Sequence, residues 1–152
     1  MRLMLIAVGR AKAGPERDLF DHYCRRLAAP LDLREVEEKK PLSGPELKRR
    51  EAQLIENAIP DGACRIALDE TGKDLSSRQL AGRLGTLRDG GTRHLAFIIG
   101  GADGLDKALL ASCDLRLSLG RQTWPHMLVR ALLAEQVYRA QCIHSGHPYH
   151  RD

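Results

Sequence analysis

Three glycines stand directly after a strongly apolar segment in the last third of the chain. The segment is His94–Ile99, and Gly100, Gly101 and Gly104 follow it at once. Glycines let a ligand approach the main chain closely, and a helix that begins after them offers free N–H groups. The spacing matches neither the dinucleotide fingerprint G-x-G-x-x-G nor a P-loop, because no G-K-[ST] follows. The residues alone leave two interpretations open, a nucleotide-like ligand site and a tight turn between a strand and a helix.

A second candidate segment runs from Gly120 to Pro125 and contains Trp124, the single tryptophan. Pro125 suits the start of a helix, because its missing N–H would have no helical partner there. Trp124, directly before it, either packs over the entry to that helix or forms the apolar wall of a pocket. The chain therefore has two glycine-bearing segments that are candidates for ligand binding.

The chain ends in His147-Pro148-Tyr149-His150-Arg151-Asp152, an unusual composition for a terminus. An aromatic ring, two imidazoles and a guanidinium beside a rigid proline suit a functional site more than a mobile tail. His144, His147 and His150 suggest a metal by their spacing, but Pro148 breaks a regular helix and no acid or well-spaced thiol completes a tetrahedral set. We therefore expect no metal, and we favour a substrate-facing site over a solvated tail.

Hydrophobic periodicity predicts strands and helices in strict alternation along the chain. The expected strands are Arg2–Val8, Asp32–Val36, Cys64–Leu68, Leu95–Ile99 and Leu115–Leu119. Helices are expected from Pro15, over Glu46–Ile59, from the capping box Ser76-x-x-Gln79, around Leu105–Leu109, and from about His126 to Ile143. This order predicts an α/β fold with a mainly parallel sheet.

Ligands of open parallel sheets bind beyond the carboxyl ends of the strands. Three predicted loops lie at such ends, and they are Asp69–Leu75, Gly100–Gly104 and Gly120–Pro125. The two glycine-bearing segments are therefore expected at one edge of the sheet.

The composition is that of one globular domain over residues 1–152, with 43% hydrophobic and 29% charged residues. The net charge of +4 permits an RNA or phosphate partner without requiring one. The four cysteines are single and widely spaced, which predicts reduced thiols and a cytoplasmic location. The apolar run at the N-terminus is too short for a signal peptide or a membrane span, so no membrane partner is expected.

The last predicted helix is apolar on more than one face, and Glu135 and Arg139 form an i,i+4 pair on what remains. A helix that is apolar on most sides must be buried on most sides. The sheet covers one side, and a second copy of the chain covering the other predicts a homodimer. The alternative is a helix sunk in the core of its own domain.

Together these segments resemble, over essentially the full length of the chain, the bacterial large-subunit ribosomal RNA pseudouridine N3-methyltransferases of the SPOUT superfamily. The matching segments are Leu3–Gly9, Ile98–Leu105, Leu117–Ser118, Thr123–His126, Arg130, Glu135–Ala140 and His147–Arg151. The glycine motif alone is weak, whereas the combination in this order is specific. The sequence departs from the usual family pattern at Trp124, where Leu or Phe is more common.

The resemblance implies a C-terminal trefoil knot, a homodimer, and S-adenosylmethionine held in the knot at the dimer interface. The implied cofactor contacts are Leu68, Gly100, Gly101, Gly120, Arg121, Gln122, Thr123, Trp124 and Pro125. The implied catalytic residues on the substrate side are His126, Tyr149, His150 and Arg151. The implied reaction is methyl transfer to N3 of a pseudouridine in large-subunit ribosomal RNA, on the assembled ribosome.

The imide nitrogen of a pseudouridine must lose a proton to attack well, so a base is useful. His126 and His150 are both candidates for that proton transfer, and the residues do not choose between them. Arg151 is a candidate contact to a phosphate or a base oxygen, and Tyr149 a candidate contact to the target base. Two other classes stay open, a ribosome-associated factor without activity and an unrelated nucleotide-binding enzyme.

One further candidate surface is basic. Arg25 and Arg26, with Lys48, Arg49 and Arg50, form either a surface that follows RNA phosphates or solvated helix faces.

Overall fold

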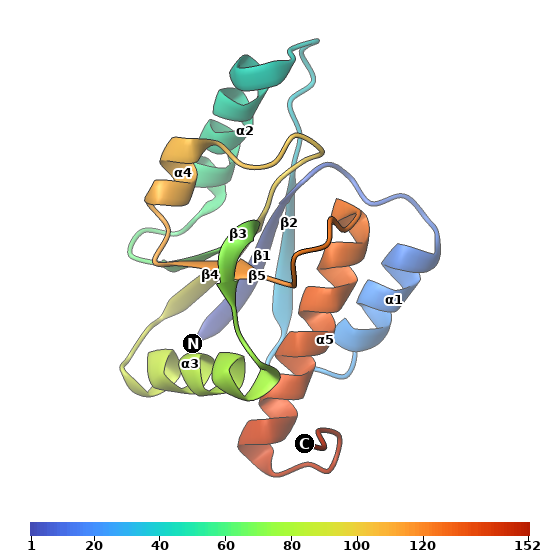
Figure 1. Ribbon diagram of the computed structural model, residues 1–152, viewed down its shortest axis with the longest axis vertical. Helices are drawn as coiled ribbons and strands as arrows, with labels where there is room; N and C mark the ends of the chain where they lie inside the picture. Colours follow the sequence, from blue (N-terminus) through green and yellow to red (C-terminus); the bar gives the residue numbers. More distant parts are fainter.

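The computed structural model describes residues 1–152 as strands and helices in strict alternation, which confirms the predicted order (Figure 1). The strands are β1 (Arg2–Val8), β2 (Leu31–Val36), β3 (Cys64–Asp74), β4 (His94–Ile99) and β5 (Leu115–Ser118). The helices are α1 (Pro15–Cys24), α2 (Gly44–Ala58), α3 (Ser77–Asp89), α4 (Lys107–Ala111) and α5 (His126–Ser145).

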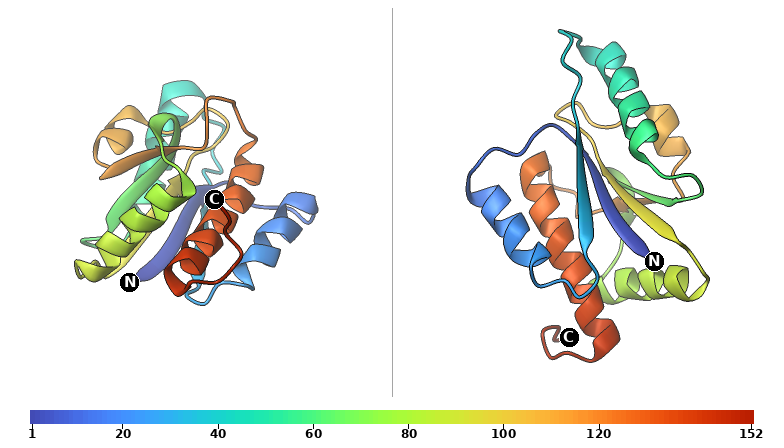
Figure 2. Two further views of the ribbon diagram at one scale, coloured as in Figure 1. Left: turned by 60° about the horizontal axis from the view of Figure 1, so that its bottom comes forward. Right: turned by 180° about the vertical axis from the view of Figure 1, so that it is seen from behind.

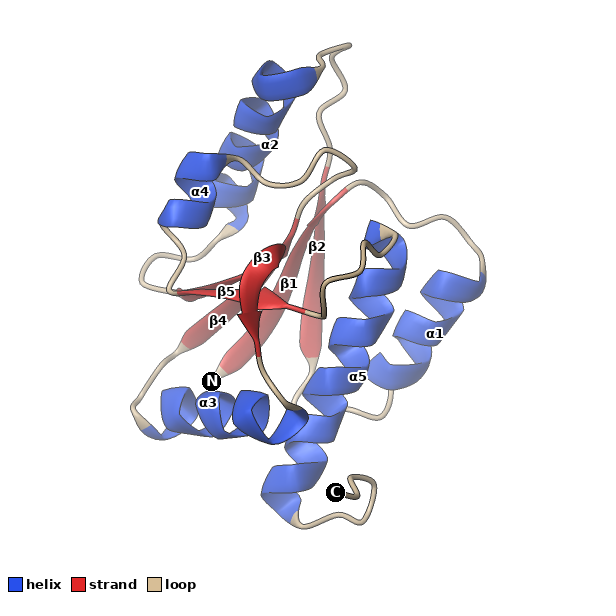
Figure 3. Ribbon diagram, viewed as in Figure 1, coloured by secondary structure: helices blue, strands red, loops and turns tan.

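The five strands form one sheet in the order β2-β1-β4-β3-β5, and every neighbouring pair is parallel (Figure 3). This confirms the α/β class with a parallel sheet. The central strands β1 and β4 are buried on both faces, as their nearly continuous apolar sequence predicts. The carboxyl ends of all five strands consequently lie at the same edge of the sheet.

Two layers of helices cover the sheet (Figure 2). Leu5 of β1 and Phe97 of β4 belong to the core cluster that includes residues of α1, α3 and α5. Ile6 and Ile98, one position further along, belong to the cluster with α2 and α4. The side chains of a strand alternate between its faces, so each central strand contributes to both cores.

Local signals in the sequence place several helix ends. Pro15 begins α1, and Ser76 begins α3 with both hydrogen bonds of the predicted capping box. Helix α5 ends at Gly146, whose φ of 71° is the left-handed conformation that glycine adopts at helix C-termini. None of the helices has the length and apolar character of a membrane span.

The structure corrects one predicted loop. Residues Asp69–Leu75 were expected to be a loop, but β3 extends to Asp74. Leu117 of β5 pairs with two residues of β3, Leu68 and Lys73. Between Leu68 and Lys73, strand β3 crosses β5 and then pairs with it a second time. A Cβ atom on Gly72 would lie 2.6 Å from the carbonyl carbon of Arg116, so only glycine fits at the crossing. Figure 3 shows this end of β3 passing in front of β5.

Helix α5 is less completely buried than its sequence suggests. Eight of its residues are buried: Arg130, Ala131, Leu133, Ala134, Val137, Tyr138, Ala140 and Cys142. Leu128, Val129 and Leu132 are only half-buried. Within one chain, α5 therefore keeps a partly exposed apolar strip.

Candidate active site

The glycine turn after β4 closes on itself. The backbone N–H of Gly104 donates to the carbonyl of Gly101 at 3.0 Å, and Gly104 has a φ of +80°. A Cβ atom on Gly100 would lie 2.9 Å from the carbonyl carbon of Gly104. The turn is thus both a tight strand-to-helix connection and a stretch of bare main chain, so the two interpretations of its sequence are compatible.

This turn lines a cavity of about 340 Å³ at the carboxyl ends of β4 and β5 and beside the middle of β3. Seven of the cofactor-binding residues implied by the resemblance line it, namely Leu68, Gly100, Gly101, Gly120, Gln122, Thr123 and Trp124. Arg121 and Pro125 lie in the same segment but do not line the cavity. Its apolar wall includes Ile99 and Leu117. The structure therefore brings together residues from three neighbouring strands of the parallel sheet, two of them at their carboxyl ends.

The segment from Gly120 to Pro125 is held at its start by the buried Ser118. The Ser118 hydroxyl donates to the carbonyl of Gly120 at 2.8 Å and accepts the backbone N–H of Gly120 at 3.2 Å. The indole N–H of Trp124 donates to the carbonyl of Leu119 at 3.2 Å, while 39% of this residue stays exposed. Trp124 lines the cavity, so its ring forms a pocket wall in addition to preceding α5.

Acidic side chains give the cavity its charge. Asp69, Glu70 and Asp103 line it, and no lysine or arginine does. Glu51 of α2 lies behind the turn, with Oε1 3.4 Å from the position of a Cβ atom on Gly101. Burial raises the pKa of the Glu51 carboxyl, and the Asp103 carboxylate raises it further. The site therefore suits a ligand that carries positive charge.

Glu51 was missed in the sequence, although a signal was there. It lies four residues after Leu47 and four before Ile55, which places a carboxylate on the inward face of α2. Charged residues are uncommon in protein cores, so a glutamate on the apolar face of a helix is unusual. The structure buries Glu51 there, with only 9% of the residue exposed.

The C-terminal residues pack against their own α5 and α1. The Tyr149 hydroxyl donates to Glu135 Oε1 at 2.9 Å, and its ring meets that of Tyr138 edge-on with centroids 4.7 Å apart. The Arg139 guanidinium lies 4.7 Å from the centre of the Tyr149 ring. Burial and hydrogen bonding to Tyr23 and Glu135 raise the pKa of Tyr149 far above its usual range, so the phenol stays protonated at neutral pH.

Two further residues of the tail, His150 and Asp152, also contact the body of the domain. His150 Nδ1 lies 3.2 Å from Arg139 Nη1, and Asp152 pairs with Arg78 at the start of α3. Arg151 is exposed. No three His, Cys, Asp or Glu side chains of the chain are grouped as metal ligands.

Within one chain, the structure separates the residues expected on the substrate side. His126 lines the cavity, whereas Tyr149, His150 and Arg151 do not. Tyr149 contacts Glu135, which is nine residues, or about 13 Å of helix, beyond His126. Glu135 and Trp124 share a neighbouring cavity of about 460 Å³ between α3 and α5. The tail thus ends beside this second hollow and away from the first.

Residues 1–150 match a family model described as "Predicted SPOUT methyltransferase". The chain belongs to the SPOUT methyltransferase family. This SPOUT methyltransferase is 60% identical to a protein of Paramagnetospirillum magneticum named "Ribosomal RNA large subunit methyltransferase H", over 99% of both chains. A protein of the same name from Rhizobium meliloti is 52% identical, again over 99% of both chains.

Solved structures share the fold of this SPOUT methyltransferase. A probable methyltransferase from Bordetella pertussis superposes with a TM-score of 0.61 at 17% identity, covering 91% of this chain and 95% of that one. A probable methylase family protein from Haemophilus influenzae gives a TM-score of 0.59 at 12% identity, covering 99% of this chain and 70% of that one. These identities are low, so the likeness supports the fold alone.

Proposed function

We propose that this SPOUT methyltransferase transfers a methyl group from S-adenosylmethionine to N3 of a pseudouridine in large-subunit ribosomal RNA, on the assembled ribosome. The observation that carries the proposal is the end-to-end match, at 60% identity, to a relative named as a ribosomal RNA large subunit methyltransferase. The pseudouridine and its N3 atom come from the family resemblance of the motifs. The acidic cavity on the glycine turn is the proposed place of the cofactor.

The residues of the cavity fit S-adenosylmethionine. Leu68, Ile99 and Leu117 offer an apolar wall for an adenine ring. Glycine at position 100 lets the turn close tightly against Gly104 and Leu105, and the turn lines the cavity with main chain. Asp69 and Asp103 offer carboxylates to the positive charges of the cofactor. When bound, the cofactor supplies an activated methyl group on a cationic sulfur. The protein supplies position and electrostatics.

His126 is the proposed residue nearest the transfer step, because it alone of the four substrate-side residues lines the cavity. Its imidazole can take the proton that the target nitrogen must lose. His150 stays the alternative. The Tyr149 hydroxyl, protonated and donating to Glu135, has its oxygen lone pairs available to accept a hydrogen bond from the base. Arg151, exposed at the tail, is available to a phosphate or a base oxygen.

The tail of one protomer completes the cavity of its partner in the proposed homodimer. Two findings support this arrangement. The tail does not line the cavity of its own chain, and α5 keeps Leu128 and Leu132 partly exposed, with Leu132 beside Trp124 in the neighbouring cavity. Residues Leu128 and Leu132 lie one helical turn apart and suit a helix-to-helix contact. In this arrangement a complete active site needs the cavity of one protomer and the tail of its partner.

The C-terminal trefoil knot also belongs to the proposal. The crossing of β3 over β5 at Gly72 supports it, because a knot requires one strand to pass across another. General topology rules make knots very rare, so the resemblance is what predicts this one.

The deciding experiment measures incorporation of labelled methyl groups from S-adenosylmethionine into intact ribosomes, separated subunits and free ribosomal RNA, with the modified base located by mass spectrometry. We expect one methyl group on a pseudouridine of the large-subunit RNA, with intact ribosomes as the best substrate. Binding to ribosomes without methyl incorporation would instead indicate a factor without activity. Binding of a dinucleotide in place of S-adenosylmethionine would indicate a different enzyme class.

A further inference from the structure

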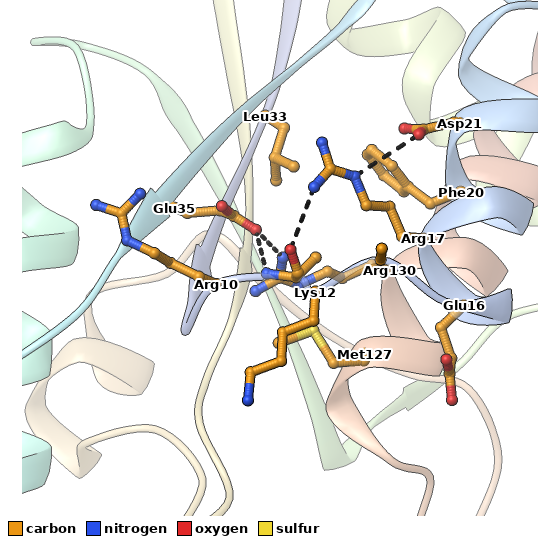
Figure 4. A pocket seen from close by; sticks show the side chains of 12 residues that line it. Arg10, Lys12, Glu16, Arg17, Phe20, Asp21, Leu33, Glu35, Met127 and Arg130 are labelled. Atoms are coloured by element: carbon orange, nitrogen blue, oxygen red, sulfur yellow. Dashed lines mark hydrogen bonds and ion pairs between the residues drawn. The ribbon is translucent and has the colours of Figure 1, made fainter.

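A separate cavity of about 340 Å³ lies on the other side of the first turn of α5, near the carboxyl ends of β1 and β2 (Figure 4). His126 and Val129 line the proposed cofactor cavity, whereas Met127 and Arg130 line this one. The first turn of α5 therefore lies between the two cavities, and both lie at the same edge of the sheet. We call it the β1–α1 cavity, because the loop between these elements forms its rim.

The walls of the β1–α1 cavity are apolar and its rim is basic. Phe20, Leu33 and Met127 offer apolar surface, and Arg10 and Lys12 stand at the loop (Figure 4). This combination is the one a nucleotide needs, because a base takes an apolar wall and its phosphate takes cations.

Ion pairs within the cavity leave one lining cation, Lys12, and one lining carboxylate, Glu16, without a partner. The Glu35 carboxylate is engaged by Arg130, and Asp21 lies 3.8 Å from Arg17. Figure 4 shows the Lys12 ammonium without an ion pair to the residues drawn. Arg10, the other cation of the rim, forms an ion pair with Glu37 at 3.4 Å. The Arg10 side chain is 69% exposed and the Glu37 side chain 46% exposed. Exposed pairs of this kind are weak and can be exchanged for a phosphate.

The floor of the cavity is the guanidinium of Arg130, which is only 2% exposed. Its Nη atoms bind the carbonyls of Val8 and Gly9 and the Glu35 carboxylate, but its Nε has no hydrogen-bond acceptor in the protein. Because its Nη atoms are all engaged within the protein, Arg130 fixes the shape of the cavity, and Lys12 is the cation left for a ligand.

We infer that the β1–α1 cavity binds a nucleotide of the RNA substrate that flanks the target base, with its base against Phe20 and Leu33 and its phosphate at Lys12. The inference rests on the proposed function for RNA as the substrate. The shared turn of α5 gives the reason for a flanking nucleotide. Because the two cavities flank one helical turn, a nucleotide next to a base in the proposed cofactor cavity can reach the β1–α1 cavity.

The test measures RNA affinity directly, by filter binding of the unmodified ribosomal particle or RNA at several salt concentrations. Lys12→Ala removes a rim cation, and Leu33→Trp fills the cavity without changing its charge. Lys39→Ala is the matched control, because Lys39 is equally exposed and lies outside the cavity. We expect Lys12→Ala to weaken binding on the order of tenfold at low salt and to reduce the salt slope by about 1.

The same variants separate this site from the cofactor cavity. Leu33→Trp is expected to raise KM for the ribosome while kcat and the affinity for S-adenosylmethionine stay unchanged. The inference is overturned if Lys12→Ala and Lys39→Ala bind RNA equally, or if Leu33→Trp binds RNA as the parent chain does. Because affinity is measured without catalysis, absence of methyl transfer would count against the proposed function alone.

Discussion

Arg130 of α5 and Glu35 of β2 form an ion pair across 95 positions of the sequence, with Nη1 2.6 Å from Oε1. Nη2 of Arg130 also donates to the carbonyls of Val8 at 3.0 Å and Gly9 at 2.8 Å. The same Glu35 oxygen accepts the backbone N–H of Ala11 at 2.8 Å. This network ties the first turn of α5 to the ends of β1 and β2, and that turn separates the two cavities.

Replacing Glu35 tests the value of this network. Glu35→Ala leaves the buried Arg130 without its counter-charge, and removal of one partner of a buried pair typically costs about 3–5 kcal/mol of unfolding free energy. Urea denaturation measures the loss. Glu37→Ala is the control, because the pair of Glu37 with Arg10 is exposed, and it should change stability by less than about 0.5 kcal/mol. Equal stability of the two variants would contradict the assignment.

Acid should weaken the same network. Burial alone would raise the pKa of Glu35, but the hydrogen bonds from Ala11 and Arg130 outweigh burial and hold the pKa below the ordinary value of 4.5. A carboxyl with a lowered pKa stabilises the fold above its unfolded pKa, and this stability is lost as the pH falls through the folded pKa. The urea midpoints of the parent chain and Glu35→Gln should therefore differ at pH 7 and converge below pH 4.5. A constant difference would show that Glu35 does not titrate in this way.

Adding one methyl group at the glycine turn should disrupt the proposed cofactor cavity. In Gly100→Ala the new Cβ atom lies 2.9 Å from the carbonyl carbon of Gly104, so the turn must open. We expect S-adenosylmethionine to bind at least about tenfold more weakly and the fold to lose about 1–3 kcal/mol. Calorimetric titration and thermal unfolding measure the two effects.

Gly82→Ala is the matched control for that experiment. Gly82 lies within α3 and a Cβ atom there meets nothing within 4 Å, so alanine should stabilise the helix by about 1 kcal/mol. Cofactor affinity should stay unchanged in this variant. Normal cofactor binding by Gly100→Ala would place the ligand elsewhere.

The tail should matter for transfer and not for cofactor binding. Tyr149→Phe loses the hydrogen bond to Glu135, and Arg151→Ala removes an exposed cation, while neither residue lines the cofactor cavity. A reacting group displaced by about 1 Å loses roughly 100-fold in rate, so we expect a kcat loss of this order with unchanged affinity for S-adenosylmethionine. A labelled-methyl assay and calorimetry measure the two quantities. Unchanged turnover in both variants would remove the tail from the active site.

Periodicity and local signals were sufficient for most of the fold. The alternation of strands and helices, the capping box at Ser76 and the helix start at Pro15 were all predicted correctly, since each depends on residues close in sequence. The extension of β3 was not predicted. Its second half pairs with β5, which begins about 40 positions later, and no local pattern reports on such a partner.

The residues of the candidate site also fall into those that the local sequence identified and one that it did not. Glycines at Gly100 and Gly101 and the segment before α5 were identified from residue type and position, because bare main chain at a strand end has a recognisable local sequence. Glu51 behind the turn was missed, although its place on the inward face of α2 was visible.

By itself, the sequence determined the order of the elements, the parallel sheet and the family resemblance, because hydrophobic spacing and motifs are properties of the chain alone. Only the tertiary structure decided which side chains meet. It placed His126 in the cavity at the glycine turn, joined Tyr149 to Glu135 by a hydrogen bond, and set Arg130 beside Glu35. These are long-range contacts that form when strands and helices pack, and their geometry depends on the closed core rather than on spacing along the chain.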